Sequence, residues 1–266
     1  MSKPQSPAEP PVLVSRDGTM VTVTINRPHK LNALTKPVWA RLGEVFTELS
    51  ADDTLRCIVL RGAGEQAFSP GNDIEEFATA RNDRDQAVAY AQVAHATAAA
   101  IDQCRHPIVA QIHGIYVGGG LLLASLCDLR ICGESCRFGV PIKNLGLVMA
   151  YAEMSPIVRL VGGDKALELL LEGRILNARE GLAMGLVSRV VADGEVAAEA
   201  RATAQRIADG APLVARWHKK FVRRLRDPRP LDEAETLECY DCFATEDFQT
   251  GYHAFLAKKK PEFHGR

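Results

Sequence analysis

The sequence predicts an α/β chain in which strands and helices alternate and a helical region follows. Three observations carry this prediction: a hairpin signal near the N-terminus, a repeated order of apolar strand and helical stretch, and a C-terminal part without strand patterns. Strands that alternate with helical stretches of this length are typical of a mainly parallel sheet.

The first elements follow from turn and capping signals. Asp17-Gly18 separates two alternating runs, residues 12–15 and 20–25, and Asp-Gly between such runs predicts a hairpin. Thr35 is suited to cap a helix, because an apolar face follows it at helical spacing. That face consists of Val38, Leu42, Val45, Phe46 and Leu49. A buried strand is predicted next, over residues 57–60.

The same order recurs along the chain. We expect a helix near residues 85–104, a strand over 108–112, a glycine-rich turn and a further apolar run into residues 129–132. The last predicted strand covers residues 187–191.

Everything after this strand has a helical pattern, with breaks at Pro212, Pro228 and Pro230. We therefore expect a flexible tail over residues 1–11, a core over residues 12–205 and a helical region over residues 206–266.

Composition narrows the class of protein. The chain has 266 residues, of which 47% are apolar and 24% charged, and no run approaches the roughly 18 apolar residues of a membrane span. A net charge of -1 gives no overall field for nucleic acid, so we expect a small-molecule partner. Seven cysteines and no secretion signal predict reduced thiols in the cytoplasm. Cys239 and Cys242 have no second pair, so no metal site is expected.

Two glycine-bearing turns are the candidate chemical feature. Residues 69–74 and 114–120 each end a strand-like run and begin a helical one. Glycine lets a main chain approach a ligand closely, and free N–H groups at a helix start point toward negative charge. Two such donors on one oxygen would form an oxyanion hole. The alternative is that both segments are only tight turns.

The sequence resembles the crotonase (enoyl-CoA hydratase/isomerase) superfamily over nearly its whole length. The resemblance rests on landmarks that occur in the same order and spacing: Asn26–Leu34, Ala67–Ile74, the triple glycine before Leu121, Cys127–Arg130, Phe138–Pro141, Asn144–Leu147, Ala183–Val187, Glu246–Gly251 and Phe255–Phe263. It implies a spiral of ββα units with a C-terminal helical trimerisation region, assembled as a homotrimer or a dimer of trimers.

The resemblance also implies a function and a site. The substrate would be an acyl-CoA thioester, as in fatty acid metabolism, with coenzyme A part of the substrate and no tightly bound cofactor. The backbone N–H groups of Asn72 and Gly119 would form the oxyanion hole. The segments that bind coenzyme A and the acyl chain would include Lys30, Leu31, Ala33, Asn72, Asp73, Ile74, Glu75, Leu122, Ile142 and Met149.

The chain departs from the hydratases of this superfamily at their acid and base. Those enzymes use two glutamates, and the matching positions here are Leu122 and Ile142. A carboxylate that some isomerases and a dehalogenase use elsewhere matches Ala150. A histidine and a tyrosine of one decarboxylase match Asn72 and Met149.

Glu153 is the candidate replacement. It lies in an unusual loop at a predicted helix start, and apolar surroundings would suit its carboxylate to proton transfer. The alternative is an exposed first-turn glutamate that the helix dipole favours. Tyr116 and Tyr151 are weaker candidates, which we expect to be core residues.

Three classes of function remain open. The first is an acyl-CoA enzyme. Within this class, isomerisation or hydration with Glu153 competes with decarboxylation or another C–C cleavage that needs only the oxyanion hole. The second is a non-catalytic acyl-CoA-binding protein. The third is RNA binding through the basic stretch at residues 216–226, for which a solvated face or a subunit contact is the simpler interpretation.

Overall fold

A six-stranded sheet and a four-stranded sheet form the core of the computed structural model, which describes residues 9–266. The predicted tail over residues 1–11 lies mostly outside the described residues. The strands are β1 (Val12–Asp17), β2 (Met20–Ile25), β3 (Cys57–Gly62), β4 (Ala67–Ser69), β5 (Ile108–Ile112), β6 (Ile115–Val117), β7 (Leu129–Gly133), β8 (Arg137–Gly139), β9 (Leu176–Asn177) and β10 (Arg189–Val191).

Helices surround both sheets. The α-helices are α1 (Lys36–Ala51), α2 (Phe77–Ala80), α3 (Arg84–Gln103), α4 (Gly119–Leu126), α5 (Tyr151–Val161), α6 (Gly163–Glu172), α7 (Ala178–Met184), α8 (Val196–Ala208), α9 (Pro212–Arg224), α10 (Glu233–Leu237) and α11 (Glu246–Leu256). Short 3₁₀ helices cover Pro28–Lys30, Ile74–Glu76, Pro141–Leu145, Asp193–Glu195 and Glu238–Ala244. Within residues 9–266, no helix has the length and apolar character needed to cross a membrane.

The large sheet has the order β1-β2-β3-β5-β7-β10. Only β1 and β2 pair antiparallel, as the Asp17-Gly18 hairpin signal predicts, and the remaining neighbours are parallel. The small sheet has the order β4-β6-β8-β9. The α/β fold class is therefore confirmed.

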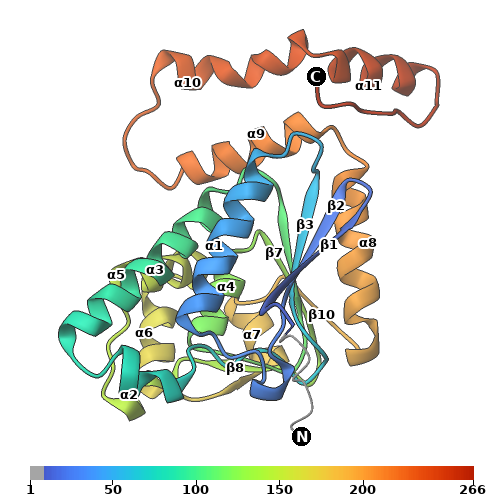
Figure 1. The fold of residues 1–266 in the computed structure, drawn as a ribbon. Helices are drawn as coiled ribbons and strands as arrows, with labels where there is room; N and C mark the ends of the chain where they lie inside the picture. The colour runs from blue at the N-terminus through green and yellow to red at the C-terminus, as the bar shows by residue number, and fades with distance from the viewer. Residues whose placement is uncertain (1–8) are drawn as a thin grey trace, which may run out of the picture.

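Helix α8 covers one face of the large sheet, and α1 and α3 lie on the other side (Figure 1). Ala200, Ala204 and Ala208 of α8 pack against β-strand residues in a small cluster of their own. The predicted boundary at residue 205 therefore falls inside α8, and the helices that leave the sheet begin only with α9.

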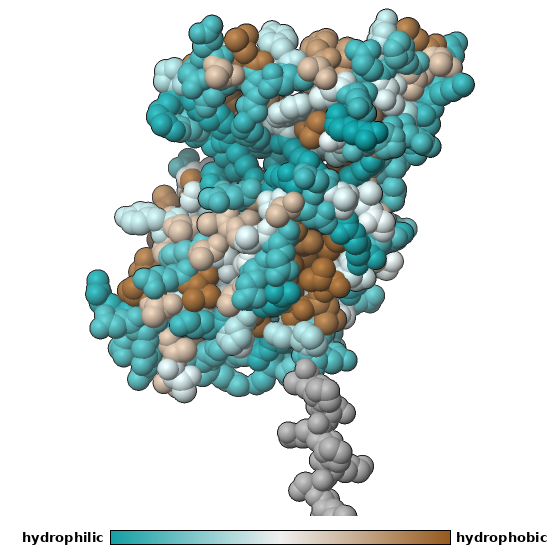
Figure 2. All heavy atoms as spheres, turned by 45° about the horizontal axis from the view of Figure 1, so that its top comes forward, coloured by the Kyte–Doolittle hydropathy of each residue, from teal (hydrophilic) through white to brown (hydrophobic). Residues whose placement is uncertain are grey.

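The helices α10 and α11 extend beyond α9 and away from both sheets (Figure 1). Their surface is mainly hydrophilic with separate hydrophobic patches (Figure 2). Residues 233–256, which include these two helices, form the C-terminal arm. Its exposed large apolar side chains are Leu237, Tyr240, Phe243, Tyr252, Phe255 and Leu256. Exposed apolar side chains of this kind are typical of subunit contacts. The trimeric assembly stays a prediction.

Candidate active site

The backbone N–H groups of Asn72 and Gly119 lie on two segments that adjoin at the start of α4. Gly119 is the first residue of that helix, so its N–H has no partner within the helix. Asn72 forms a parallel bridge with Leu34, in which the hydrogen bonds are made by Gly71 O and Asp73 N. Neither the Asn72 N–H nor the Gly119 N–H donates to an acceptor among residues 9–266.

Glycine at residue 71 is what lets the two segments approach. Gly71 has a φ of +93°, and a Cβ there would lie 2.7 Å from the Gly119 nitrogen and 2.8 Å from the Val117 oxygen. Any other residue would therefore push against the second donor. The glycines that predict tight turns also bring the two N–H groups together.

Side chains fix the loop that carries Asn72. The indole Nε1 of Trp39 donates a hydrogen bond of 2.8 Å to the side-chain oxygen of Asn72. One residue further, Asp73 accepts a 3.2 Å bond from Glu75 N and pairs with Arg27 at 3.0 Å. The Arg27 guanidinium also donates to Ala33 O at 2.7 Å. Asp73 thus holds the turn.

The two N–H groups open into a pocket with a volume of about 370 Å³. Its walls are largely apolar, with a few charged residues. It is lined by Lys30, Ala33, Trp39, Pro70, Asn72, Asp73, Ile74, Phe77, Arg81, Val117, Gly118, Gly119, Leu122, Pro141, Ile142, Leu145, Leu147, Val148, Met149 and Glu153. A mostly apolar cavity with a few convergent polar groups is the usual form of a small-molecule site.

Most of the residues expected at the site line this pocket. The structure brings together Lys30, Ala33, Asn72, Asp73, Ile74, Leu122, Ile142, Met149, Gly119 and Glu153. Leu31 and Glu75 do not line it. Leu31 lies at the end of a 3₁₀ turn with a left-handed φ of 52°, and Glu75 forms a 2.6 Å ion pair with Lys30 at the rim. Their predicted contacts with coenzyme A stay predictions.

Glu153 matches neither sequence interpretation completely. It lies in the first turn of α5, where its Oε2 accepts a 3.1 Å bond from Ala150 N, as a helix-capping glutamate does. Its side chain is only 21% exposed, however, and faces the pocket. Its Oε1 lies 3.6 Å from Nε2 of His95 on α3, and this nitrogen is buried and has no hydrogen-bond partner among the described residues.

The two tyrosines behave differently from each other. Tyr116 is fully buried against Phe68 and Phe138, and burial raises the pKa of its hydroxyl well above the usual value, so it is a core residue as expected. The same expectation is wrong for Tyr151, which is 92% exposed. It is the first residue of α5 and lies at the surface.

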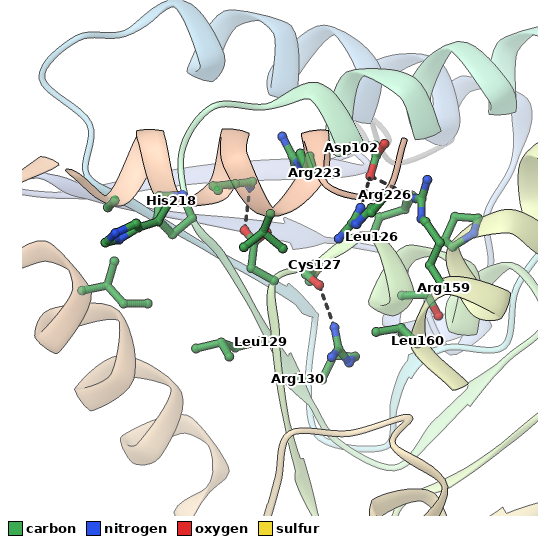
Figure 3. Close-up of a pocket in the computed structure, with 18 residues that line it drawn as sticks. Asp102, Leu126, Cys127, Leu129, Arg130, Arg159, Leu160, His218, Arg223 and Arg226 are labelled. Atoms are coloured by element: carbon green, nitrogen blue, oxygen red, sulfur yellow. Dashed lines mark hydrogen bonds and ion pairs between the residues drawn. The ribbon is translucent and has the colours of Figure 1, made fainter. Parts of the chain in front are cut away.

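A second cavity of about 380 Å³ lies beneath α9 (Figure 3). Its charges are paired internally. Arg159 and Arg226 both point to Asp102, at 3.1 Å and 3.8 Å, as the dashed lines show. Lys219 is buried and lies 2.6 Å from Asp128, whose carboxylate also accepts Ile108 N at 2.7 Å. Because these charged groups already pair with one another, few of them can bind a substrate.

The basic stretch at residues 216–226 is therefore a packing face of α9. Arg216 donates to Asp53 O and Leu55 O, and Arg223 donates to Cys104 O. The carboxylates of Glu238 and Glu235 bind Lys220 and Arg224, so the remaining cations are paired as well. The interpretation as a solvated face is wrong for most of this stretch, because its side chains dock α9 on the core and on the C-terminal arm. Such paired cations argue against a nucleic-acid surface.

Comparison with known proteins decides the family. The family model described as enoyl-CoA hydratase/isomerase matches residues 15–266 of this chain. The chain belongs to the enoyl-CoA hydratase/isomerase family. The expected membership of the crotonase superfamily and its fold is thereby confirmed.

Relatives of this enoyl-CoA hydratase/isomerase family member match nearly its whole length. It is 36% identical over 255 residues to a probable enoyl-CoA hydratase of Mycobacterium bovis, covering 95% of this chain and 97% of that protein. The short-chain-enoyl-CoA hydratase of Clostridium acetobutylicum is 30% identical, with 94% and 96% covered. A crystal structure of an enoyl-CoA hydratase/carnithine racemase from Magnetospirillum magneticum matches with a TM-score of 0.95 and 48% identity over 97% of both chains.

Three residues of this family member's site are not singled out by the sequence: Trp39 and Arg81, which line the pocket, and His95, which contacts the pocket residue Glu153. Trp39 was left out of the predicted apolar face, although it is buried beside it on α1. His95 falls within a helix that the spacing predicts, but nothing in the sequence shows that α3 meets α5. Arg81 follows the short helix α2, in a segment with no motif.

Proposed function

We propose that this family member is an acyl-CoA enzyme that stabilises a thioester enolate with the N–H groups of Asn72 and Gly119 and moves a proton with Glu153. The observation that carries the proposal is that both unpaired N–H groups and this carboxylate line one apolar pocket. The relatives named enoyl-CoA hydratase support the choice of substrate.

The two N–H groups would act on the thioester carbonyl oxygen. When a base removes the proton from the carbon next to the carbonyl, the electron pair of that C–H bond moves to the oxygen as an enolate. Preorganised donors stabilise such a charge most where water is excluded. The glycines of the site allow the two donors to be preorganised, because they let the backbone segments approach each other closely without side chains in the way.

Glu153 would carry the proton. Its Oε2 is held by Ala150 N, which leaves Oε1 as the oxygen that takes the proton. The resulting carboxylic acid can return that proton to another carbon of the delocalised chain, which moves a double bond. One carboxyl group suffices for this exchange, and atoms and charges balance without a second acid.

The apolar walls favour a proton shift over the addition of water. The resemblance to the family implies that Leu122 and Ile142 stand where its hydratases carry glutamates, and both residues line the pocket. Neither side chain can bind or orient a water molecule. Hydration on this chain would need Glu153 alone to activate water and to supply the proton.

A second candidate is decarboxylation or another C–C cleavage that yields the enolate directly. One observation favours it: the Glu153 carboxylate already caps α5, a role that accounts for its presence without chemistry. The pair of N–H groups needs no carboxylate in such a reaction.

A mass-spectrometric turnover screen separates these reactions. The wild type and Glu153→Gln would be incubated with 2-enoyl-, 3-enoyl-, 3-hydroxyacyl- and malonyl-type CoA thioesters. We expect double-bond migration or hydration that falls at least about 100-fold in the variant. Turnover that survives the substitution supports decarboxylation or cleavage. Binding of thioesters with no turnover at all would mean a non-catalytic acyl-CoA-binding protein.

A further inference from the structure

The charged residues that line the acyl pocket are satisfied, with one exception. Lys30 pairs with Glu75, and Asp73 pairs with Arg27. The carboxylate of Glu153 accepts Ala150 N and lies beside His95. Arg81 lines the same pocket, yet its guanidinium has no carboxylate within 4.0 Å among residues 9–266.

Arg81 is nevertheless held in place. Its guanidinium carbon lies 4.7 Å from the ring centre of Phe77 and 4.8 Å from that of Tyr90. The Tyr90 hydroxyl is itself anchored, at 3.2 Å from Leu34 O and 3.2 Å from a Glu76 oxygen. Two aromatic rings thus fix the cation by cation–π contact, while its guanidinium N–H groups donate to no acceptor among the residues that the structure describes.

The carboxylate nearest in the chain is already engaged. Glu76 Oε2 accepts hydrogen bonds from Lys36 N at 2.9 Å and from the Tyr90 hydroxyl. A planar guanidinium that is fixed in position and has no acid partner is suited to bind a carboxylate from a ligand by two parallel hydrogen bonds.

Helix α3 relates Arg81 to the reactive carboxylate. Arg81 stacks on Tyr90, and Glu153 faces His95, and both of these residues belong to α3. At 1.5 Å per residue, the backbone positions of Tyr90 and His95 lie about 7.5 Å apart along the helix axis. An acyl chain of a few carbons spans such a distance.

We propose that Arg81 binds a carboxylate at the far end of the acyl chain, so that the preferred substrates are thioesters of dicarboxylic acids. This inference rests on the proposed function and adds the substrate class. Apolar residues that line the same pocket, such as Phe77 and Leu122, would contact the methylene groups of the chain.

The test compares the binding of hexanoyl-CoA and adipoyl-CoA by calorimetry. Both acyl chains have six carbons, and they differ by a methyl or a carboxylate at the far end. We expect wild-type protein to bind adipoyl-CoA at least about tenfold more tightly, and Arg81→Gln to lose this preference without a change for hexanoyl-CoA. Arg81→Lys, which keeps the charge without the planar fork, should retain part of it.

The matched control is Arg84→Gln. Arg84 lies three residues further on, is 90% exposed and does not line the pocket, so both affinities should stay unchanged. Thermal unfolding of each variant shows that it is folded.

The outcomes separate the inference from the proposed function. Equal wild-type affinity for both thioesters overturns the inference alone. An equal loss of both affinities and of free coenzyme A affinity in Arg81→Gln also overturns it, because Arg81 would then bind a phosphate of the coenzyme. If the wild type binds no thioester, the proposed function itself fails, and the inference with it.

Discussion

The indole nitrogen of Trp39 and the side-chain oxygen of Asn72 are joined by a hydrogen bond of 2.8 Å. Trp39 is almost fully buried on α1, and Asn72 provides one of the two free N–H groups. The bond therefore links the hydrophobic core directly to the candidate oxyanion hole.

Trp39→Phe tests this link. Phenylalanine keeps an aromatic ring but cannot donate the hydrogen bond, so Asn72 loses a fixed position. We expect kcat to fall by about 10- to 100-fold with a folded protein, because small displacements of a reacting group carry costs of this size. Steady-state kinetics would measure this fall in kcat. An unchanged kcat would mean that the Gly71 and Leu34 backbone alone fixes the loop.

Gly71→Ala tests the close approach of the two donors. A Cβ at residue 71 would press on the Gly119 nitrogen and the Val117 oxygen. We expect at least about 100-fold lower activity, the size of effect seen when an oxyanion donor is lost.

Gly64→Ala is the matched control for this substitution. Gly64 also has a positive φ, of +72°, but a Cβ there meets nothing within 4 Å. It should lose about 1 kcal/mol of unfolding free energy through backbone strain and keep its activity. Similar losses of activity in both variants would contradict a specific role of Gly71.

His95→Gln tests the partner of Glu153. The substitution removes the imidazole that lies 3.6 Å from Glu153 Oε1 and leaves the capping bond from Ala150 N intact. We expect kcat to fall about tenfold while KM changes little, since His95 acts only through Glu153. Gln92→Ala, an exposed change on the same helix, serves as the control. A rise in KM alone would indicate a role in binding instead.

His106 predicts an acid sensitivity of the fold. The ring is fully buried, neither nitrogen has a hydrogen-bond partner within residues 9–266, and burial and the nearby Arg216 and Arg105 lower its pKa to about 4. The unfolded chain, with a histidine pKa near 6.5, then binds a proton that the folded protein does not. The contribution of the neutral His106 ring to the free energy of unfolding is fully present above about pH 6.5. It is lost as the pH falls toward 4.

His106→Leu isolates this effect. Across that pH range the wild type should lose about 3 kcal/mol more unfolding free energy than the variant, measured by denaturant unfolding. His29→Leu, at an exposed site, should follow the wild type. Parallel pH profiles of wild type and His106→Leu would show that the buried ring is protonated without cost.

Local signals in the sequence predict much of the fold. Asp17-Gly18 forms the predicted hairpin, and Thr35 accepts Val38 N as the predicted cap of α1. The boundary at residue 205 was harder to predict, because α8 has the same helical pattern as the region that follows. Only its packing on the sheet assigns it to the core.

The site was predictable where it depends on the backbone and less so where it depends on distant side chains. Glycine patterns indicate the two turns, and the resemblance to the crotonase superfamily points to Asn72 and Gly119 within them. The close backbone approach requires glycine at residue 71. The contact of His95 with Glu153 depends on how α3 crosses α5, which local periodicity does not encode. The pairing of Lys219 on α9 escaped prediction for the same reason, as its partner Asp128 lies far away in the chain.

The central claim is that this chain forms a thioester enolate, and deuterium exchange measures that step directly. The protein would be incubated with 3-hexenoyl-CoA in D₂O, and deuterium in the acyl chain followed by mass spectrometry. We predict incorporation by the wild type that falls at least about 100-fold in both Gly71→Ala and Glu153→Gln. Thioester that binds to the wild type and is recovered with neither deuterium in the acyl chain nor a shifted double bond would contradict the account.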